Sequence, residues 1–299
     1  MDLATLAIFR SVAKEQSVTR ASELVGRAPS NVTTRIQQLE SDIGIALFQR
    51  ETKRMVLTPE GDTFLEYVER ILNLADEARQ IVNPTEPLGV LRVGSMEATA
   101  ATRLPIPLAQ FNAQYPKVTI DLTTGPTRQL VEALLARRID CALVAVPADE
   151  WWLSSSDVDM VPLFREELVL LLPPGHPEIE KPEDIKPEAL AAFAPGCTYR
   201  MLAEEWVAGM VSKRTQLRLQ EVRSYHAMIA CVAAGACFSI LPRAVLDSVP
   251  HKDQFTIKPL TTVNTQLVSR PGYRTAAFTK LRATLIAAGD FGEEADAQQ

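Results

Sequence analysis

The chain has 299 residues, of which 46% are hydrophobic and 23% charged, and its formal net charge is −6. This composition is typical of a globular protein that buries a core, and the length favours two domains. No apolar run reaches the roughly 18 residues of a membrane span. Asp2 and Arg10 interrupt the N-terminal apolar pattern of a signal peptide, so we expect a cytoplasmic protein with no membrane partner.

Residues 1–58 are predicted to form short helices. Apolar residues recur at helical spacing near the N-terminus, Ser17 can cap a second helix, and Gly26 can end it in a tight turn. A third helix opens at Pro29 or Ser30 and ends at Gly44. Two short helices around a glycine turn indicate a helix-turn-helix, and "LFQRETKRMVLTPEG" after them predicts a short basic hairpin.

The third helix has an unusual exposed composition. It carries Asn and Thr, which are mediocre helix formers, together with Gln, and no Asp or Glu occurs from Leu24 to Leu39. Residues 1–58 hold eight Lys/Arg and six Asp/Glu, a balance of +2 against −8 for the rest of the chain. A surface that approaches phosphates would avoid carboxylates in this way.

A longer helix is predicted from Pro59 to about Val82. Its apolar residues step by three and four positions along a seam, as expected for a helix that pairs with a second copy, although such a stripe could also pack on its own chain. The predicted seam consists of Phe64, Val68, Ile71, Ala75, Ala78 and Val82. "NPTEPLG", residues 83–89, then interrupts the helix as a linker.

From residue 90 onward strands and helices alternate, which indicates mostly parallel sheets with crossover helices in two α/β lobes. Strands are predicted over 90–96, 118–124, 140–146, 166–173, 217–223, 237–242, 255–260 and 265–269. Helices are predicted over 104–115, 128–137, 201–213, 227–234 and 276–287, followed by a polar tail at 289–299. The four cysteines (Cys141, Cys197, Cys231, Cys237) lack metal-site spacing, so buried thiols are the simplest interpretation and a redox or metal role the alternative.

The order of these parts resembles the LysR-type transcriptional regulators. The matching run is "VTRASELVGRAPSNVTTRIQQLESDIGIALFQR" followed by "LTPEG", and "LRVGS", "RIDCALV" and "VAAGACFSILP" match farther on. The resemblance covers nearly the whole chain, although Pro29 stands where family members often have Gln. It implies a multidomain α+β fold: an all-α winged helix-turn-helix over 1–58, a linker (dimerisation) helix and hinge over 59–89, and a two-lobed, periplasmic-binding-protein-like α/β domain over 90–299. Lobe I spans about 90–162 and 267–299, and lobe II about 163–266.

In this family the third helix reads DNA. Arg35 can pair with guanine, Asn31 suits adenine, and threonine methyl groups can contact thymine. Ser30 can contact a phosphate near the helix N-terminus, and basic residues of the wing hold the DNA backbone. The predicted DNA-binding residues are Ser30, Asn31, Thr33, Thr34, Arg35, Gln38, Arg50, Lys53 and Arg54. Thr58 and Pro59 are expected to start the next helix, a structural role.

The resemblance also implies an inducer bound between the two lobes, where loops follow strand ends. The predicted effector-binding residues are Ser95, Met96, Glu97, Thr99, Thr127, Thr198, Tyr199, Arg200 and His226. Arg200 could grip a carboxylate or form a surface salt bridge, and Glu97 could bind an amine or zwitterion or serve as a surface or capping residue. Thr127, Thr198 and His226 could equally be ordinary turn and helix-start residues, and Cys197 leaves thiol sensing open.

The predicted partners are double-stranded promoter DNA with an interrupted palindrome, a second copy of the chain in a homodimer and further in a homotetramer, RNA polymerase, and a small-molecule effector of unknown identity. No other cofactor is expected. A solute-binding protein and an enzyme are disfavoured, because the chain has an N-terminal helical module and none of the common catalytic motifs. A cytoplasmic sensor that does not read DNA directly is the alternative.

Overall fold

The computed structural model describes residues 1–51, 54–82, 86–146, 157–180, 184–208 and 218–291. Its contacts divide the chain into two compact units, one formed by Met1–Asn83 with Ala136–Arg138 and the other by Pro84–Leu135 with Ile139–Gln299. The last part of the helix predicted to reach residue 213 and most of the predicted tail lie outside the described residues.

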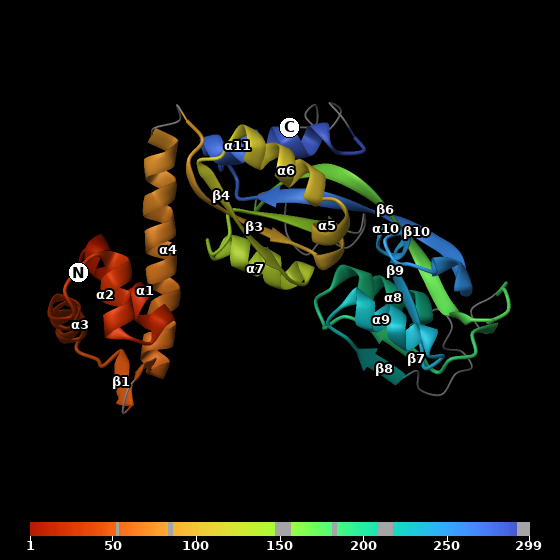
Figure 1. Cartoon of the computed structure of the whole chain (residues 1–299), viewed down its shortest axis with the longest axis horizontal. Helices are drawn as coiled ribbons and strands as arrows, with labels where there is room; N and C mark the ends of the chain where they lie inside the picture. The colour runs from red at the N-terminus through yellow and green to blue at the C-terminus, as the bar shows by residue number, and fades with distance from the viewer. Residues whose placement is uncertain (52–53, 83–85, 147–156, 181–183, 209–217, 292–299) are drawn as a thin grey trace. The chain divides into compact units, whose positions relative to one another are not determined.

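The first unit contains four helices and a two-stranded sheet among its described residues. Figure 1 shows α1–α3 on one side of α4, and of these α1 packs against it. The predicted hairpin is present as this two-stranded sheet, in which β1 and β2 pair antiparallel from Phe48↔Leu57 to Glu51↔Arg54. The description of residues 1–58 as all-α therefore applies to the helices alone. The elements are α1 (Leu3–Glu15), α2 (Val18–Val25), α3 (Pro29–Ile43), β1 (Phe48–Glu51), β2 (Arg54–Leu57) and α4 (Pro59–Val82).

Local capping chemistry sets these helix boundaries. Asp2 Oδ1 accepts a hydrogen bond from the Thr5 N–H at 2.7 Å at the start of α1, and Ser17 Oγ accepts from the Arg20 N–H at 3.4 Å at the start of α2. Gly26 ends α2 with a left-handed φ of 62°. The predicted start of α4 at Thr58 and Pro59 is confirmed, because Thr58 Oγ1 accepts a hydrogen bond from the Gly61 N–H at 3.0 Å.

The helix α4 has two apolar faces. Val68 and Leu72 are buried in the core with α1, and Phe64 packs against the same cluster, so Phe64 and Val68 are not free for a second chain. That part of the predicted seam is wrong, because the small domain uses these residues for its own core. A different set stays exposed at steps of four and three, here called the α4 stripe: Tyr67, Ile71, Leu74, Ala78 and Ile81.

The second unit is built on one eight-stranded sheet in the order β4-β3-β5-β10-β6-β9-β7-β8. Parallel pairs lie at both ends, and the long strands β10 and β6 run antiparallel through the middle and join the two lobes. The strands are β3 (Gly89–Ser95), β4 (Val118–Thr124), β5 (Cys141–Val146), β6 (Asp159–Pro174), β7 (Ala189–Ala192), β8 (Arg218–Glu221), β9 (Phe238–Pro242) and β10 (Phe255–Ser269).

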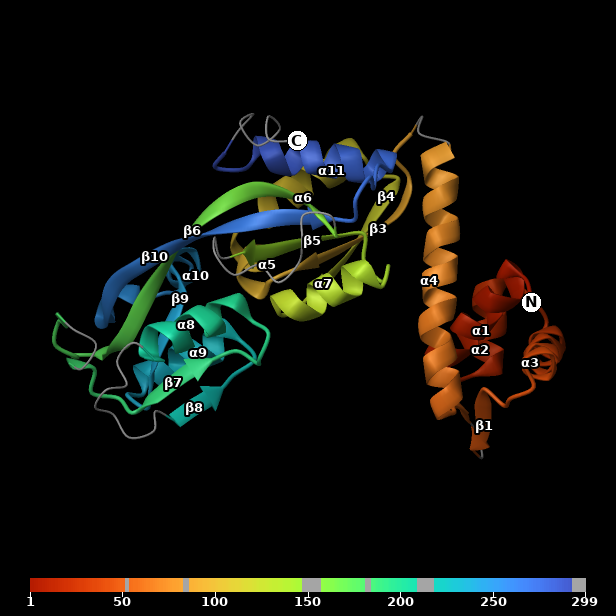
Figure 2. The same cartoon turned by 180° about the vertical axis from the view of Figure 1, so that it is seen from behind.

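Helices cover both faces of the sheet in the first lobe: α6 and α11 lie together on one face and α7 on the other (Figure 2). In the second lobe α9 packs against β6, β7 and β9. The helices are α5 (Glu97–Thr102), α6 (Pro105–Gln114), α7 (Thr127–Leu135), α8 (Thr198–Ala208), α9 (Tyr225–Ala233), α10 (Arg243–Asp247), the short 3-10 turn η2 (Lys252–Gln254) and α11 (Ala276–Ala287).

Three differences from the sequence-based expectation have local causes. The strands predicted over 255–260 and 265–269 are one strand, because a bulge between Pro259 and Thr261 lets the pairing continue past the proline. The strand predicted over 166–173 begins earlier, at Asp159. The elements α5, β7 and α10 were not predicted, since they have only four to six residues each.

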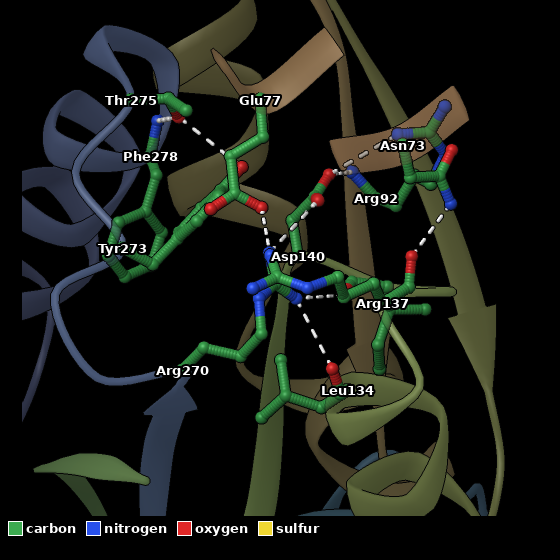
Figure 3. A network of polar contacts seen from close by, with 11 residues as sticks. Asn73, Glu77, Arg92, Leu134, Arg137, Asp140, Arg270, Tyr273, Thr275 and Phe278 are labelled. Atoms are coloured by element: carbon green, nitrogen blue, oxygen red, sulfur yellow. Dashed lines mark hydrogen bonds and ion pairs between the residues drawn. The ribbon is translucent and has the colours of Figure 1, made fainter. Parts of the chain in front are cut away.

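A buried ion pair fastens the first lobe (Figure 3). Asp140 accepts a hydrogen bond from the Arg92 N–H at 2.8 Å, and its other oxygen lies 3.8 Å from Arg270 Nη2. Arg270 Nη1 also donates to the carbonyl oxygens of Leu134 (3.2 Å) and Ile139 (2.8 Å). The pair therefore joins the turn between α7 and β5 to β3 and to the end of β10.

Candidate functional site

The third helix divides into a core face and an exposed face as expected. Val32, Ile36 and Leu39 are buried in the core of the first unit. On the opposite side the predicted DNA-binding residues Ser30, Asn31, Thr34, Arg35 and Gln38 are exposed, and Thr33 is half-buried. The polar side chains are thus held out by a helix whose orientation is fixed by its apolar face.

The two threonines of α3 use their hydroxyl protons inside the helix. Thr33 Oγ1 donates to the Pro29 carbonyl at 3.0 Å, and Thr34 Oγ1 donates to the Ser30 carbonyl at 2.9 Å. These side chains therefore have no hydroxyl proton left for a partner. Their methyl groups remain for apolar contact, which is the contact expected with thymine.

Arg35 is held at the surface by the N-terminus of α1. Its Nη1 lies 3.6 Å from Asp2 Oδ2, while Asp2 Oδ1 caps the helix. The hydrogen bond from Thr5 lowers the pKa of Asp2, and the charge of Arg35 lowers it further. Both side chains are exposed, so solvent screens the pair and Arg35 can exchange Asp2 for another acceptor.

The hairpin that follows α3 is attached to it through a carboxylate. Glu40 Oε1 accepts hydrogen bonds from the backbone N–H groups of Leu47 (2.8 Å) and Phe48 (3.0 Å). Glu40 lies in the run of sequence that carries the family resemblance, and the sequence alone indicated no role for it. Arg54 is exposed, Arg50 pairs with Met55 in the hairpin, and Lys53 lies outside the described residues.

A cavity of about 390 Å³ lies in the second unit where loops follow the carboxyl ends of parallel strands. Its wall includes residues 96–97 after β3, 124–126 at the end of β4, 193–194 after β7 and 221–223 at the end of β8. Gln129, Cys197, Tyr199 and Tyr225 complete the wall. The volume is in the range of small-molecule sites in proteins.

Three of the predicted effector residues, Met96, Glu97 and Tyr199, line this cavity. Thr127 and Thr198 do not line it but meet behind the wall. Thr198 Oγ1 lies 2.9 Å from both Thr127 Oγ1 and the Ala145 carbonyl oxygen, and Thr127 Oγ1 donates to Met96 Sδ at 3.3 Å. They form a polar contact between α7 and α8 that supports the cavity.

The other four predicted residues are placed elsewhere. Ser95 is buried and donates to the Met96 carbonyl at 3.0 Å, and Thr99 is buried with no hydrogen-bond partner for its hydroxyl among the described residues. His226 is exposed in the first turn of α9. Arg200 Nε donates to Glu204 at 2.8 Å and its Nη1 to the Phe193 carbonyl at 2.9 Å, so the surface salt bridge is the alternative that the structure shows.

Sequence reasoning missed the wall residues that follow β4, β7 and β8. Phe193 follows β7, a strand that the sequence did not predict, so it carried no signal. Glu221 and Arg223 lie at the end of a strand that was predicted. Applying the rule for strand carboxyl ends there would have found them.

Burial sets the electrostatics of the cavity. It raises the pKa of the Glu97 carboxyl, opposed by a hydrogen bond from the Tyr225 backbone N–H and by the charge of His226. It also raises the pKa of the Cys197 thiol and raises the pKa of Tyr199 well above its usual value. Because a thiolate is the reactive form of cysteine, the Cys197 environment favours an inert thiol over a sensing one.

Family models match both units of the chain. The model of the bacterial regulatory helix-turn-helix protein, lysR family, matches residues 3–62. The LysR substrate binding domain model matches residues 84–290, more than two thirds of the chain. The chain belongs to the LysR family of transcriptional regulators. The expected family and function, a LysR-type DNA-binding regulator with an effector-binding domain, are confirmed.

Named LysR-family relatives match over most of their length. The HTH-type transcriptional regulator GltR of Bacillus subtilis is 34% identical over 292 residues, which is 96% of this chain and 92% of the relative. YofA of Bacillus velezensis is 35% identical over 252 residues, 82% of each chain. Such regulators are generally not enzymes.

Solved LysR-family structures share the fold. A full-length OxyR variant from Pseudomonas aeruginosa aligns with a TM-score of 0.72 at 20% identity, covering 100% of this chain and 99% of the other. Full-length CbnR complexed with its target DNA aligns with a TM-score of 0.67 at 21% identity, covering 97% and 100%. These likenesses confirm the predicted combination of an N-terminal helix-turn-helix domain with a two-lobed α/β domain. Within the described part of the chain, no helix is both long and apolar enough to cross a membrane.

Proposed function

We propose that this LysR-family regulator acts in the cytoplasm as a homodimer that places α3 in the major groove at each half of an interrupted palindrome. The observation that carries the proposal is the exposed face of α3, where Asn31, Arg35 and Gln38 stand out from a buried apolar face. These side-chain types are the ones that read base edges. The solved CbnR complex with DNA supports the placement.

The wing supplies contacts to the backbone. Arg54 is exposed on β2, and Glu40 fixes the start of the hairpin relative to α3. Arg50 and Lys53 are proposed to act with Arg54 as phosphate contacts. These contacts orient the module without carrying sequence information.

Pairing of two copies is proposed to occur through the α4 stripe. Large apolar side chains exposed at seam spacing on one helix are expected to bury themselves against the same stripe of a second copy. Assembly into a tetramer and contact with RNA polymerase are further proposals that rest on the family resemblance alone.

The cavity in the second unit is proposed to hold the effector. Met96, Glu97 and Tyr199 line it, and Ser95, Thr99, Thr127, Thr198, Arg200 and His226 lie on the elements that form its walls and support. An effector would change DNA binding only through a difference in its affinity for two arrangements of the protein.

Selection of duplexes from a random pool, followed by fluorescence-anisotropy titration, tests the DNA-binding proposal. We expect Arg35→Ala to weaken binding to the selected site by about 1–3 kcal/mol and to relax discrimination at one base pair. Arg54→Ala, the matched variant on the wing, should weaken all duplexes alike and reduce the salt dependence. Unchanged discrimination by Arg35→Ala would contradict the assignment, and failure to enrich any duplex would favour a sensor that does not read DNA.

A further inference from the structure

The cavity in the second unit contains a half-buried carboxylate that lies in its wall. Glu97 begins α5 two residues after the last residue of β3, and it lines the cavity together with Met96, Phe193 and Tyr225. An acidic residue in the first turn of a helix is ordinary. The unusual feature is that this side chain is half-buried against an apolar and aromatic wall.

The described residues provide no cation that pairs with Glu97. Its only hydrogen bond in the described structure comes from the Tyr225 backbone N–H, and the imidazole of His226 is the one other group that favours its ionised form. Arg200, which the sequence suggested as a possible ligand of an effector carboxylate, is held by Glu204, the Phe193 carbonyl and Glu221. The protein therefore leaves Glu97 without a full countercharge.

The other charged groups of the wall do not make the cavity suitable for an anion. Glu221 adds a second carboxylate, 3.4 Å from Arg200 Nη1, and Arg223 is exposed. Arg103, the residue that ends α5, forms an ion pair with the buried Glu166, with Nε and Oε1 2.8 Å apart. An anion deep in the cavity would meet Glu97 without an unengaged buried arginine to bind it.

The rest of the wall suits an apolar body and a positive charge. The rings of Phe193 and Tyr225 pack edge to face with centroids 4.7 Å apart, and Met96, Pro126 and Val222 add apolar surface. Aromatic faces attract cations as well as apolar groups. A desolvated carboxylate gains more from a cation than an exposed one does, because the local dielectric is low.

We propose that the effector of this regulator is a small organic ammonium compound with an apolar body, whose positive group pairs with Glu97 inside the cavity. The inference rests on the proposed function in one respect, namely that this cavity is the effector site. A simple amine and an amino acid share this chemistry. The exposed guanidinium of Arg223 can hold the carboxylate of an amino acid at the rim, so the two sources differ in their need for Arg223.

Matched triplets of compounds test the proposal on the full-length protein. Phenethylamine, L-phenylalanine and 3-phenylpropanoate share one skeleton, and pentylamine, L-norleucine and hexanoate share another. Within each triplet, comparison shows whether the ammonium or the carboxylate is required. Skeletons of two to eight carbons extend the panel, and thermal unfolding followed by isothermal titration calorimetry measures binding.

We expect at least one ammonium compound to raise the unfolding temperature and its deaminated acid to have no effect. Glu97→Gln should weaken that binding at least tenfold, while Glu132→Gln, which removes an exposed carboxylate of α7 outside the cavity wall, should leave it unchanged. Arg223→Gln should weaken an amino acid and leave a simple amine unaffected.

Tighter binding of the acids, full binding of an amine to Glu97→Gln, or no binding by any ammonium compound of the panel would overturn the proposal. Titration of the wild-type protein with duplex DNA, without added compound, tests the proposed DNA-binding function separately. A protein that binds DNA but no ammonium compound would refute only the effector class.

Discussion

The α4 stripe predicts how the chain responds to a charge placed between two copies. Ile71, Leu74 and Ile81 are 37%, 48% and 44% exposed. Complete burial of such a side chain contributes about 1.5–3 kcal/mol. Burying the exposed remainder of these three would contribute about 2–4 kcal/mol per helix and about 4–8 kcal/mol for a symmetric pair, before the cost of association.

Ile71→Asp should therefore shift the protein from dimer to monomer. Each copy loses about 1 kcal/mol of apolar burial, and each new carboxylate must also be desolvated close to its counterpart, at a cost of at least the same size. We expect the dissociation constant of the dimer to rise at least about 100-fold, since every 1.4 kcal/mol is roughly a factor of ten. Binding to a palindromic duplex should weaken with it.

Sedimentation velocity from nanomolar to micromolar protein measures the change, and circular dichroism shows whether the variant is folded. Gln80→Asp is the matched control, because it adds the same charge to α4 on a different side of the helix. A variant Ile71→Asp that dimerises as tightly as the wild type would refute the reasoning. Equal disruption by Gln80→Asp would show that charge on α4, not the stripe, controls assembly.

Three further predictions concern stability and are checked by urea unfolding. Gly61→Ala should destabilise the first unit by about 1–3 kcal/mol or more, because the new Cβ would lie 2.1 Å from the Leu47 carbonyl oxygen; an unchanged midpoint would contradict that contact. Arg270→Met should cost about 3 kcal/mol or more by leaving Asp140 buried without this partner, and a second change, Asp140→Asn, should recover part of the loss. Glu97→Gln should stabilise the free protein near pH 7. The raised pKa of Glu97 means that folding favours the neutral carboxyl, so the stability of the wild type falls as pH rises through that pKa. The stability gained by Glu97→Gln should vanish below about the ordinary pKa of 4.5, and a gain that is independent of pH would contradict the burial argument.

Elements with strong local signals were predictable from the sequence. The third helix starts at Pro29 and ends before Gly44, and the last helix spans Ala276–Ala287, as the sequence indicated. In these cases helical periodicity and breaker residues agree. Tertiary context was not needed to choose between alternatives.

Elements that depend on tertiary context were not predictable. The sequence of β7, "ALAA", is rich in a strong helix former, and it becomes a strand because it lies buried between β8 and β9. The two apolar faces of α4 also look alike in sequence. Only packing against α1 decides that Val68 belongs to the core and that Ile71 stays exposed.

The candidate sites were predictable to the extent that their residues follow a predicted element. Asn31 and Arg35 lie on the exposed face of a helix that the sequence located well, and Glu97 follows a predicted strand. Arg200 was weighed evenly as an effector ligand, yet Glu204 stands four residues later on the same helix. An ion pair at that spacing is a common local alternative that the sequence already displays.

The long strands β6 and β10 limit how the second unit can deform. They stay paired from Asp159↔Ser269 to Pro174↔Phe255, and the ladder is irregular between Pro259 and Thr261 and again between Thr265 and Gln266, on either side of the stretch that joins the lobes. Among the described residues, only β6 and β10 continue the sheet between Asn264, where β10 begins to pair with β5, and Leu168, where β6 begins to pair with β9. Such a two-stranded stretch can bend and twist without breaking its hydrogen bonds, and irregular positions concentrate the bending. The lobes are thus connected by two continuous strands, so any change in the angle between the lobes must bend both strands together.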